Sequence, residues 1–196
     1  MQLVCRKSDG LVKYAFKDSE VIRWEKGILS FPVKALDIKE NDYEILVCEK
    51  LPDIFTGNLY NFVNGAFEIA NQEMYNDLLF QSEKEKLITE IKLRYNNLAT
   101  APVLIESENL TFNGGDASAS AINSSISMDE MQGLTETKIW DVSNVVHTFS
   151  IDVAKGIAFQ IANKYRETMY EKQNKLTEIN NCVTIDELEL LAETLK

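Results

Sequence analysis

The sequence predicts an α+β protein with a small N-terminal antiparallel β head, a connecting helix, and a C-terminal α+β domain with a hairpin and a long helix. Short runs of strand-forming residues separated by turns fill the first part of the chain. Apolar residues then recur at helical spacing, and strand and helix patterns follow one another beyond Pro102. We therefore divide the 196 residues into a β-rich head (1–70), a connecting helix (71–100) and an α+β domain (101–196).

The head is predicted from turn signals and β-branched or aromatic runs. Residues 43–48 form the clearest strand, because they combine strand-forming side chains with a largely apolar run. Asn64-Gly65 separates two further runs, 59–63 and 66–69. This dipeptide suits the type I′ turn of a hairpin, which needs positive φ at both central residues. We expect four to six short strands in a small antiparallel sheet or partial barrel.

The connecting helix is predicted from apolar residues at three- and four-residue steps over residues 71–98. The polar stretch 82–86 interrupts this apolar stripe. Two arrangements fit the pattern: a single helix that bridges two lobes, or two helices that meet at a break in this stretch. Pro102 disfavours helix at the residue before it, so the helix should end near Thr100.

The C-terminal domain should begin with a strand that runs from Val103 to Phe112 and then turns at Gly114-Gly115. Asp116 can cap a following helix by accepting backbone N–H bonds. This helix is rich in Ser and Ala over 117–127, which would let it lie close to a neighbouring element, and it should stop at Gly133.

A β-hairpin of residues 138–142 and 145–149 is predicted next, followed by a long helix over 151–179. Ser150 is a candidate N-cap for the long helix. Thr184 with Glu187 three residues later forms the pattern of a capping box at the start of a last helix.

The charge and composition exclude several classes of protein. The chain has 31 acidic and 20 basic residues, a net charge of −11, and 45% hydrophobic residues, which is typical of a globular chain. Coating nucleic acid requires an excess of Lys and Arg, so no nucleic-acid partner is expected. No apolar run approaches the roughly 20 residues of a membrane span, and the N-terminus lacks the pattern of a signal peptide.

The acidic excess is concentrated in the C-terminal part. Residues 101–196 hold 7 basic and 15 acidic residues, a net charge of −8. This excess fits either a solvated surface that keeps the protein soluble or a face that steers a basic partner. The sequence does not separate these two alternatives.

Residues that carry chemistry are scarce. The only histidine, His147, lies on a predicted strand beside apolar residues, so we interpret it as structural. Cys5, Cys48 and Cys182 are far apart and are expected to be reduced thiols, with a Cys5–Cys48 bridge as the less favoured alternative. We expect no catalytic residues, no cofactor and no metal site, because a zinc site needs about four clustered ligands.

The C-terminal residues resemble a domain of unknown function that is common at the C-terminus of tailed-bacteriophage tail and tail-fibre-assembly proteins. The resemblance covers roughly residues 80–196. It rests on packing and capping motifs, which are Leu110-Thr111-Phe112-Asn113-Gly114-Gly115-Asp116, Met131-Gln132-Gly133-Leu134-Thr135, Ile139-Trp140-Asp141 and Val145-Val146-His147-Thr148-Phe149. Thr184, Glu187 and Leu188 match the family's "T-x-x-E-L" ending, whereas Cys182 stands where an alanine is expected.

The head resembles, more loosely, the small β heads of phage tail proteins with a "Y-x-F-x-x-G-x-F" element. The residues that fit this element are Tyr60, Phe62, Gly65 and Phe67. The family carries no catalytic residues, so none can be transferred to this chain.

The resemblance implies a non-enzymatic tail component or adaptor that docks on the baseplate or tail fibre as a structural virion protein. The alternative is a tail-fibre assembly chaperone bound to the fibre tip. Expected partners are other phage tail or fibre proteins, with a homo-oligomer as a further option. The expected location is the virion tail, and the host cytoplasm during assembly.

Four aromatic residues are the candidate partner-binding residues: Trp24 and Phe31 in the head, and Tyr165 and Tyr170 on the long helix. Trp and Tyr are enriched at the energetically important positions of protein interfaces. Burial in an ordinary core is the alternative interpretation for each of them.

Overall fold

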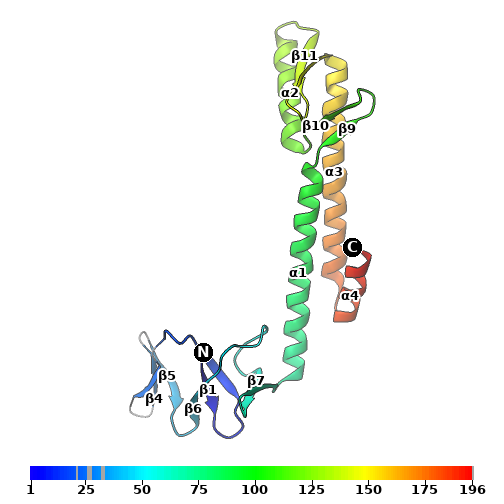
Figure 1. The fold of residues 1–196 in the computed structure, drawn as a ribbon. Coiled ribbons are helices and arrows are strands. Elements are labelled where there is room, and N and C mark those ends of the chain that lie inside the picture. The colour runs from blue at the N-terminus through cyan, green and yellow to red at the C-terminus, as the bar shows by residue number, and fades with distance from the viewer. Residues whose placement is uncertain (21, 26–27, 32–33, 196) are drawn as a thin grey trace. The chain divides into compact units, whose positions relative to one another are not determined.

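The structure, a computed structural model, describes residues 1–20, 22–25, 28–31 and 34–195. The side chains of residues 25, 31 and 34–37 also lie outside this description. The chain forms two compact units, Met1–Ser82 and Glu83–Lys196. Small antiparallel sheets come first and helices with β-hairpins follow, so the predicted α+β class is confirmed (Figure 1). The division into head, connecting helix and C-terminal domain stays a prediction.

The N-terminal unit holds eight strands among its described residues, more than the four to six expected. They are β1 (Gln2–Arg6), β2 (Val12–Phe16), β3 (Arg23–Glu25), β4 (Ile28–Phe31), β5 (Lys34–Lys39), β6 (Tyr43–Val47), β7 (Tyr60–Val63) and β8 (Ala66–Ile69). They form three separate antiparallel sheets, ordered β2-β1-β6, β3-β4-β5 and β7-β8. The expectation of one sheet or partial barrel is therefore wrong, because local strand signals do not specify which strands pair.

Strand β1 supplies side chains to two cores. Leu3, Val4 and Cys5 are all buried. Successive side chains of a strand point to opposite faces. Accordingly, Leu3 and Cys5 pack with residues of β7 and the start of helix α1 (Gln72–Thr100), whereas Val4 packs with Leu29 and Ile38 of the second sheet. The three cysteines are free thiols, so the Cys5–Cys48 bridge is not formed.

The hairpin predicted at Asn64-Gly65 is confirmed. Strands β7 and β8 pair from Tyr60↔Ile69 to Val63↔Ala66. Asn64 has a φ of 51° and Gly65 a φ of 83°, both in the left-handed region that a type I′ turn needs.

Helix α1 (Gln72–Thr100) is continuous. The alternative of two helices with a break at residues 82–86 is therefore wrong. The helix ends two residues before Pro102, as predicted. Its buried residues recur every four positions, at Leu87, Ile91, Tyr95 and Ala99. Within the described chain, no helix combines the length and apolar character that crossing a bilayer requires.

The C-terminal unit continues with two β-hairpins and three helices. Its elements are β9 (Val103–Ile105), β10 (Leu110–Phe112), α2 (Asp116–Met131), β11 (Glu136–Trp140), β12 (Val146–Ser150), α3 (Ile151–Asn181) and α4 (Ile185–Thr194). The single strand expected from Val103 to Phe112 is instead the antiparallel hairpin β9–β10. Asn109, with a φ of 51°, allows the chain to reverse between its strands.

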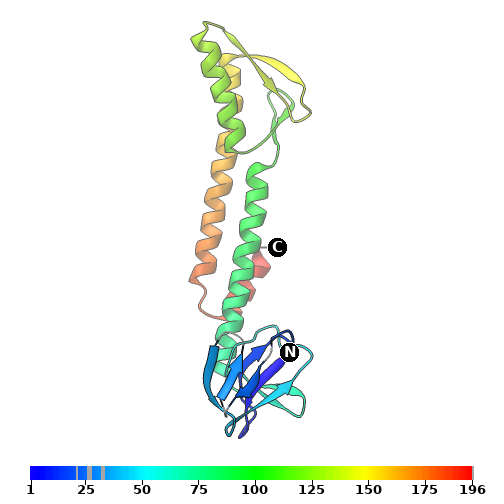
Figure 2. The same ribbon diagram turned by 90° about the vertical axis from the view of Figure 1, so that its left-hand side faces the viewer.

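Helix α2 lies alongside α3 in both views (Figures 1 and 2). Ala119, Ile122 and Ile126 are the buried residues of α2, and they join Ile157 and Ile161 of α3 in one core. The small side chain of Ala119 permits close packing. The hydroxyls of Ser124 and Ser127 instead donate hydrogen bonds to backbone carbonyls of their own helix. Ala119 is the only Ser or Ala of the run 117–127 that is buried in this core, so the close approach expected from the Ser/Ala content stays a prediction.

Of the three helix N-caps predicted from the sequence, one is wrong and two are confirmed. Gly115, not Asp116, is the N-cap of α2, and no side chain caps this helix. Ser150 caps α3 by accepting the N–H of Val153. Thr184 and Glu187 form the complete capping box of α4. Asp116 lies one residue inside its helix, where a carboxylate can still interact favourably with the helix dipole.

Candidate functional site

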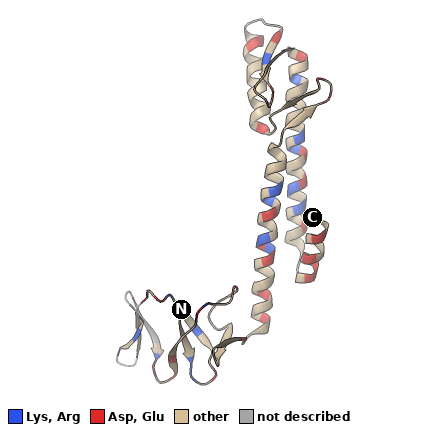
Figure 3. Cartoon of the chain, in the orientation of Figure 1, with Lys and Arg blue, Asp and Glu red and all other residues tan. Residues whose placement is uncertain are grey.

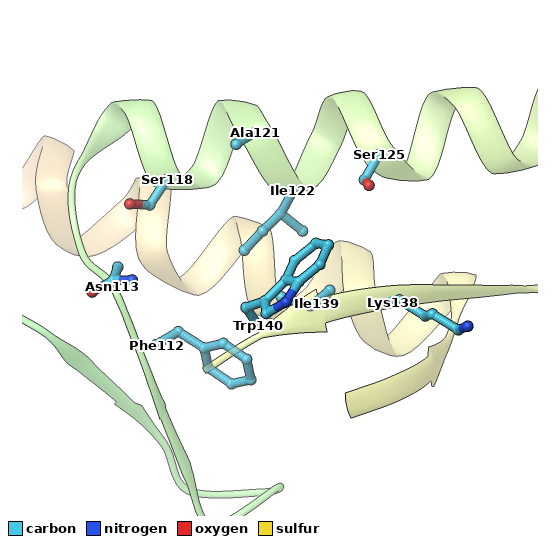
Figure 4. Close-up of a pocket in the computed structure, with 9 residues that line it drawn as sticks. All are labelled: Phe112, Asn113, Ser118, Ala121, Ile122, Ser125, Lys138, Ile139 and Trp140. Carbon is cyan, nitrogen blue, oxygen red and sulfur yellow. The ribbon is translucent and has the colours of Figure 1, made fainter. Parts of the chain in front are cut away.

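The strongest candidate surface of the C-terminal unit is a groove between α2 and β11. One part is a pocket of about 180 Å³. It is lined by Phe112, Asn113, Ser118, Ala121, Ile122, Ser125, Lys138, Ile139 and Trp140 (Figure 4). The floor is apolar because Phe112, Ile122 and Ile139 belong to the buried core.

A wider hollow of about 450 Å³ continues the groove. It is lined by Ser125, Asp129, Leu134, Thr135, Glu136, Thr137, Lys138, Trp140 and Thr148. Ser125, Lys138 and Trp140 line both parts, so the two hollows are contiguous. We call the combined surface the α2–β11 groove.

Strand alternation places Trp140 in this groove. On β11, Thr137 and Ile139 are buried, whereas Lys138 and Trp140 face outward. Trp140 remains 57% exposed. Figure 4 shows its indole between the β11 ribbon and the helix that carries Ile122. An exposed indole above an apolar floor is typical of an interface residue, because Trp offers a large apolar face and one N–H donor.

Thr137 adds an unmet hydrogen bond beneath the groove. It is 3% exposed and lines the wider hollow. Its Oγ1 atom is buried without a hydrogen-bond partner among the described residues. Most buried polar side-chain atoms in proteins have a partner.

A polar network closes the hairpin beside the groove. The Asp141 carboxylate accepts N–H bonds from Ser143 at 2.8 Å and Val145 at 2.9 Å. Its second oxygen lies 3.0 Å from Nε2 of His147. The His147 hydrogen bond, followed by these backbone donors, lowers the pKa of Asp141 below its ordinary value. His147 therefore supports the turn that follows Trp140, in line with the structural role expected for it.

Acidic residues dominate the chain around the groove. From residue 95 to residue 154, Lys138 is the only Lys or Arg, beside eight Asp and Glu. Figure 3 shows both kinds of charge along these elements. Glu130 pairs with Lys155 at 2.7 Å. Asp129 and Glu136 line the groove, and neither forms an ion pair with any residue that the structure describes.

The four aromatic residues proposed from the sequence differ in their surroundings where the structure describes them. Trp24 is partly buried against the core around Leu29, which favours the core alternative for it. The side chain of Phe31 lies outside the described residues. On α3, Tyr165 is half-buried and Tyr170 is 65% exposed. Five positions separate these tyrosines, which is about 140° around a helix, so they do not share a face.

The Gly114-Gly115 turn is used for packing. A Cβ atom on Gly114 would lie 1.9 Å from the carbonyl oxygen of Ala101, and Gly115 has a φ of 93°. The two glycines thus let the chain cross the end of α1 before α2 begins. In the described part of the chain, no group of three His, Cys, Asp or Glu residues could hold a metal ion.

Lys138 and Trp140 were not among the residues proposed from the sequence, although a signal for them was present. The run Thr137-Lys138-Ile139-Trp140 alternates, and the paired positions Thr137 and Ile139 suggest one inner face. Lys138 lies on the opposite face and marks it as exposed to solvent. The same alternation places Trp140 on this exposed face. The contribution of α2 to the groove had no local signal, because it depends on how α2 packs against the hairpin.

Comparisons of the chain with protein-family models, curated proteins and solved structures found no match.

Proposed function

We propose that this chain is a non-enzymatic component or adaptor of a phage tail, which docks on the baseplate or tail fibre as a structural virion protein. The exposed position of Trp140 over the apolar floor of the α2–β11 groove is the observation that carries the docking role. A protein whose work is docking needs such an accessible apolar surface beside a stable core.

The phage-tail assignment is supported by the resemblance over residues 80–196. The residues that carry this resemblance have packing and capping roles in the structure. Gly114 makes room for the carbonyl of Ala101, and Thr184 with Glu187 caps α4. The tryptophan-bearing hairpin lines the groove.

The non-enzymatic role is supported by the use that the fold makes of its only histidine. A serine or cysteine nucleophile needs a neighbouring base. The ring of His147 is hydrogen-bonded to Asp141, and no Ser or Cys side chain among the described residues forms a hydrogen bond with it. The proposed partners are other tail or fibre proteins, together with further copies of this chain, and nucleic acid is not among them. The proposed location is the virion tail, after assembly in the host cytoplasm.

Quantitative mass spectrometry of purified particles tests this proposal. We expect the protein at a copy number that matches the symmetry of the tail. Ser125→Leu places an apolar side chain in the groove and should reduce incorporation. Ser124→Leu makes the same change at the preceding position of α2, outside the groove lining, and should be incorporated normally.

Absence from mature particles would overturn the structural role. If the absent protein co-purifies with unassembled fibres, the assembly-chaperone alternative replaces it. Cleavage of host glycans by the purified protein, abolished by a single acidic substitution, would overturn the non-enzymatic role.

A further inference from the structure

We propose that the α2–β11 groove binds a segment of a different protein in which a large apolar side chain stands next to Lys or Arg. This inference rests on the proposed docking function and specifies the chemistry of the partner. The apolar side chain would occupy the smaller pocket against Trp140. The basic residue would face the wider hollow.

The apolar part of the proposal follows from the shape and lining of the smaller pocket. Its volume is about 180 Å³, and Phe112, Ile122 and Ile139 form its floor. Covering Trp140 removes apolar surface from water, which favours binding. Ser118 and Ser125 lie at the α2 side of the pocket, where they can bond to the backbone of a bound segment.

The basic part follows from the unpaired charges of the wider hollow. Asp129 and Glu136 line this hollow and have no ion-pair partner among the described residues. Lys138 supplies the only positive charge in the groove lining. A Lys or Arg on the partner would face an excess of negative charge there. An acidic partner would be repelled.

The acidic surroundings also argue against a second copy of this chain as the occupant. In a two-fold dimer the same patch would meet itself. Asp129 and Glu136, with Lys138 as the only positive charge of the groove lining, would then face an equal excess of negative charge. The same excess disfavours a nucleic-acid strand.

Selection of binders from a displayed library of short random peptides tests the proposal on the full-length chain. Trp24→Phe leaves Trp140 as the only tryptophan, so its fluorescence reports on the groove. We expect the selected peptides to share a large apolar residue beside Lys or Arg. Their binding should shift the emission of Trp140 to shorter wavelength. Ser125→Leu should abolish this binding, whereas Ser124→Leu should preserve it.

The charge requirement is tested with two double variants that change net charge equally. Asp129→Asn with Glu136→Gln should weaken peptide binding about tenfold, since two charge contacts are lost. Glu106→Gln with Glu108→Gln, near the β9–β10 turn, should leave it unchanged.

Three results would overturn the inference. They are the absence of a shared motif, an enrichment of acidic peptides, and binding that Ser125→Leu does not reduce. A dimer in solution that Ser125→Leu dissociates would assign the groove to a second copy instead. Incorporation into particles is measured separately, so the docking function can stand when this partner chemistry fails.

Discussion

Nε2 of His147 lies 3.0 Å from Oδ2 of Asp141, across the end of the β11–β12 hairpin. The other oxygen of Asp141 accepts two backbone N–H groups of the turn. One carboxylate therefore connects the turn to β12 and fixes the chain directly after Trp140. This small network directly follows Trp140, which lines the groove.

Asp141→Ala should lower the melting temperature at neutral pH, because the turn donors lose their acceptor. The pKa of Asp141 is lowered in the folded protein, so its ionised form adds stability above the ordinary value of 3.8. That contribution is lost as the pH falls through the lowered folded-state pKa. Thermal unfolding followed by circular dichroism should thus show a difference between wild type and variant that shrinks below pH 3.8. A difference that stays constant into strong acid would contradict this assignment.

The three cysteines should differ in reactivity. Burial, with smaller contributions from Glu44 and Cys48, raises the pKa of the Cys5 thiol to about 11. Burial also raises the pKa of Cys48. Cys182 is half-exposed at the end of α3. Because the thiolate is the reactive form, a disulfide reagent at mildly alkaline pH should modify Cys182 first and the other two only after unfolding. Cys182→Ser should remove the fast phase, and its persistence would refute the prediction.

Two glycine substitutions should have opposite effects on stability. Gly114→Ala places a Cβ atom 1.9 Å from the backbone oxygen of Ala101, so the chain must shift. We expect a loss of more than about 1 kcal/mol in the free energy of unfolding. Gly156→Ala, inside α3, meets no atom within 4 Å other than its chain neighbours and the adjacent backbone of its own helix, and should add about 0.5–1 kcal/mol. Urea denaturation of both variants measures the two changes, and a stabilising Gly114→Ala would contradict the close approach.

The capping box should determine whether α4 is formed. Thr184 Oγ1 accepts the N–H of Glu187, whose side chain accepts the N–H of Thr184 in return. Thr184→Ala should cost about 0.5–2 kcal/mol. Amide exchange should be faster in residues 185–194 of this variant, whereas Thr184→Ser, which keeps the hydroxyl, should retain protection. Equal exchange in both variants would show that α4 is held by packing alone.

The local features of the fold were predictable because each depends on a few neighbouring residues. The Asn64-Gly65 turn, the end of α1 before Pro102 and the caps at Ser150 and Thr184 were all predicted from short motifs. Each motif satisfies backbone groups or dihedral limits within its own segment. The α+β class followed from the same local patterns.

What the sequence could not determine was which elements meet. The N-terminal unit has three sheets where one was expected, and residues 103–112 form a hairpin where a single strand was expected. Both differences arise because strand pairing depends on contacts between distant segments. The groove has the same origin. Alternation on β11 turned Trp140 outward, but only the packing of α2 beside this hairpin placed Ser125 and Asp129 opposite it. The sequence thus determined the elements and their caps, whereas tertiary packing decided where the exposed apolar surface lies.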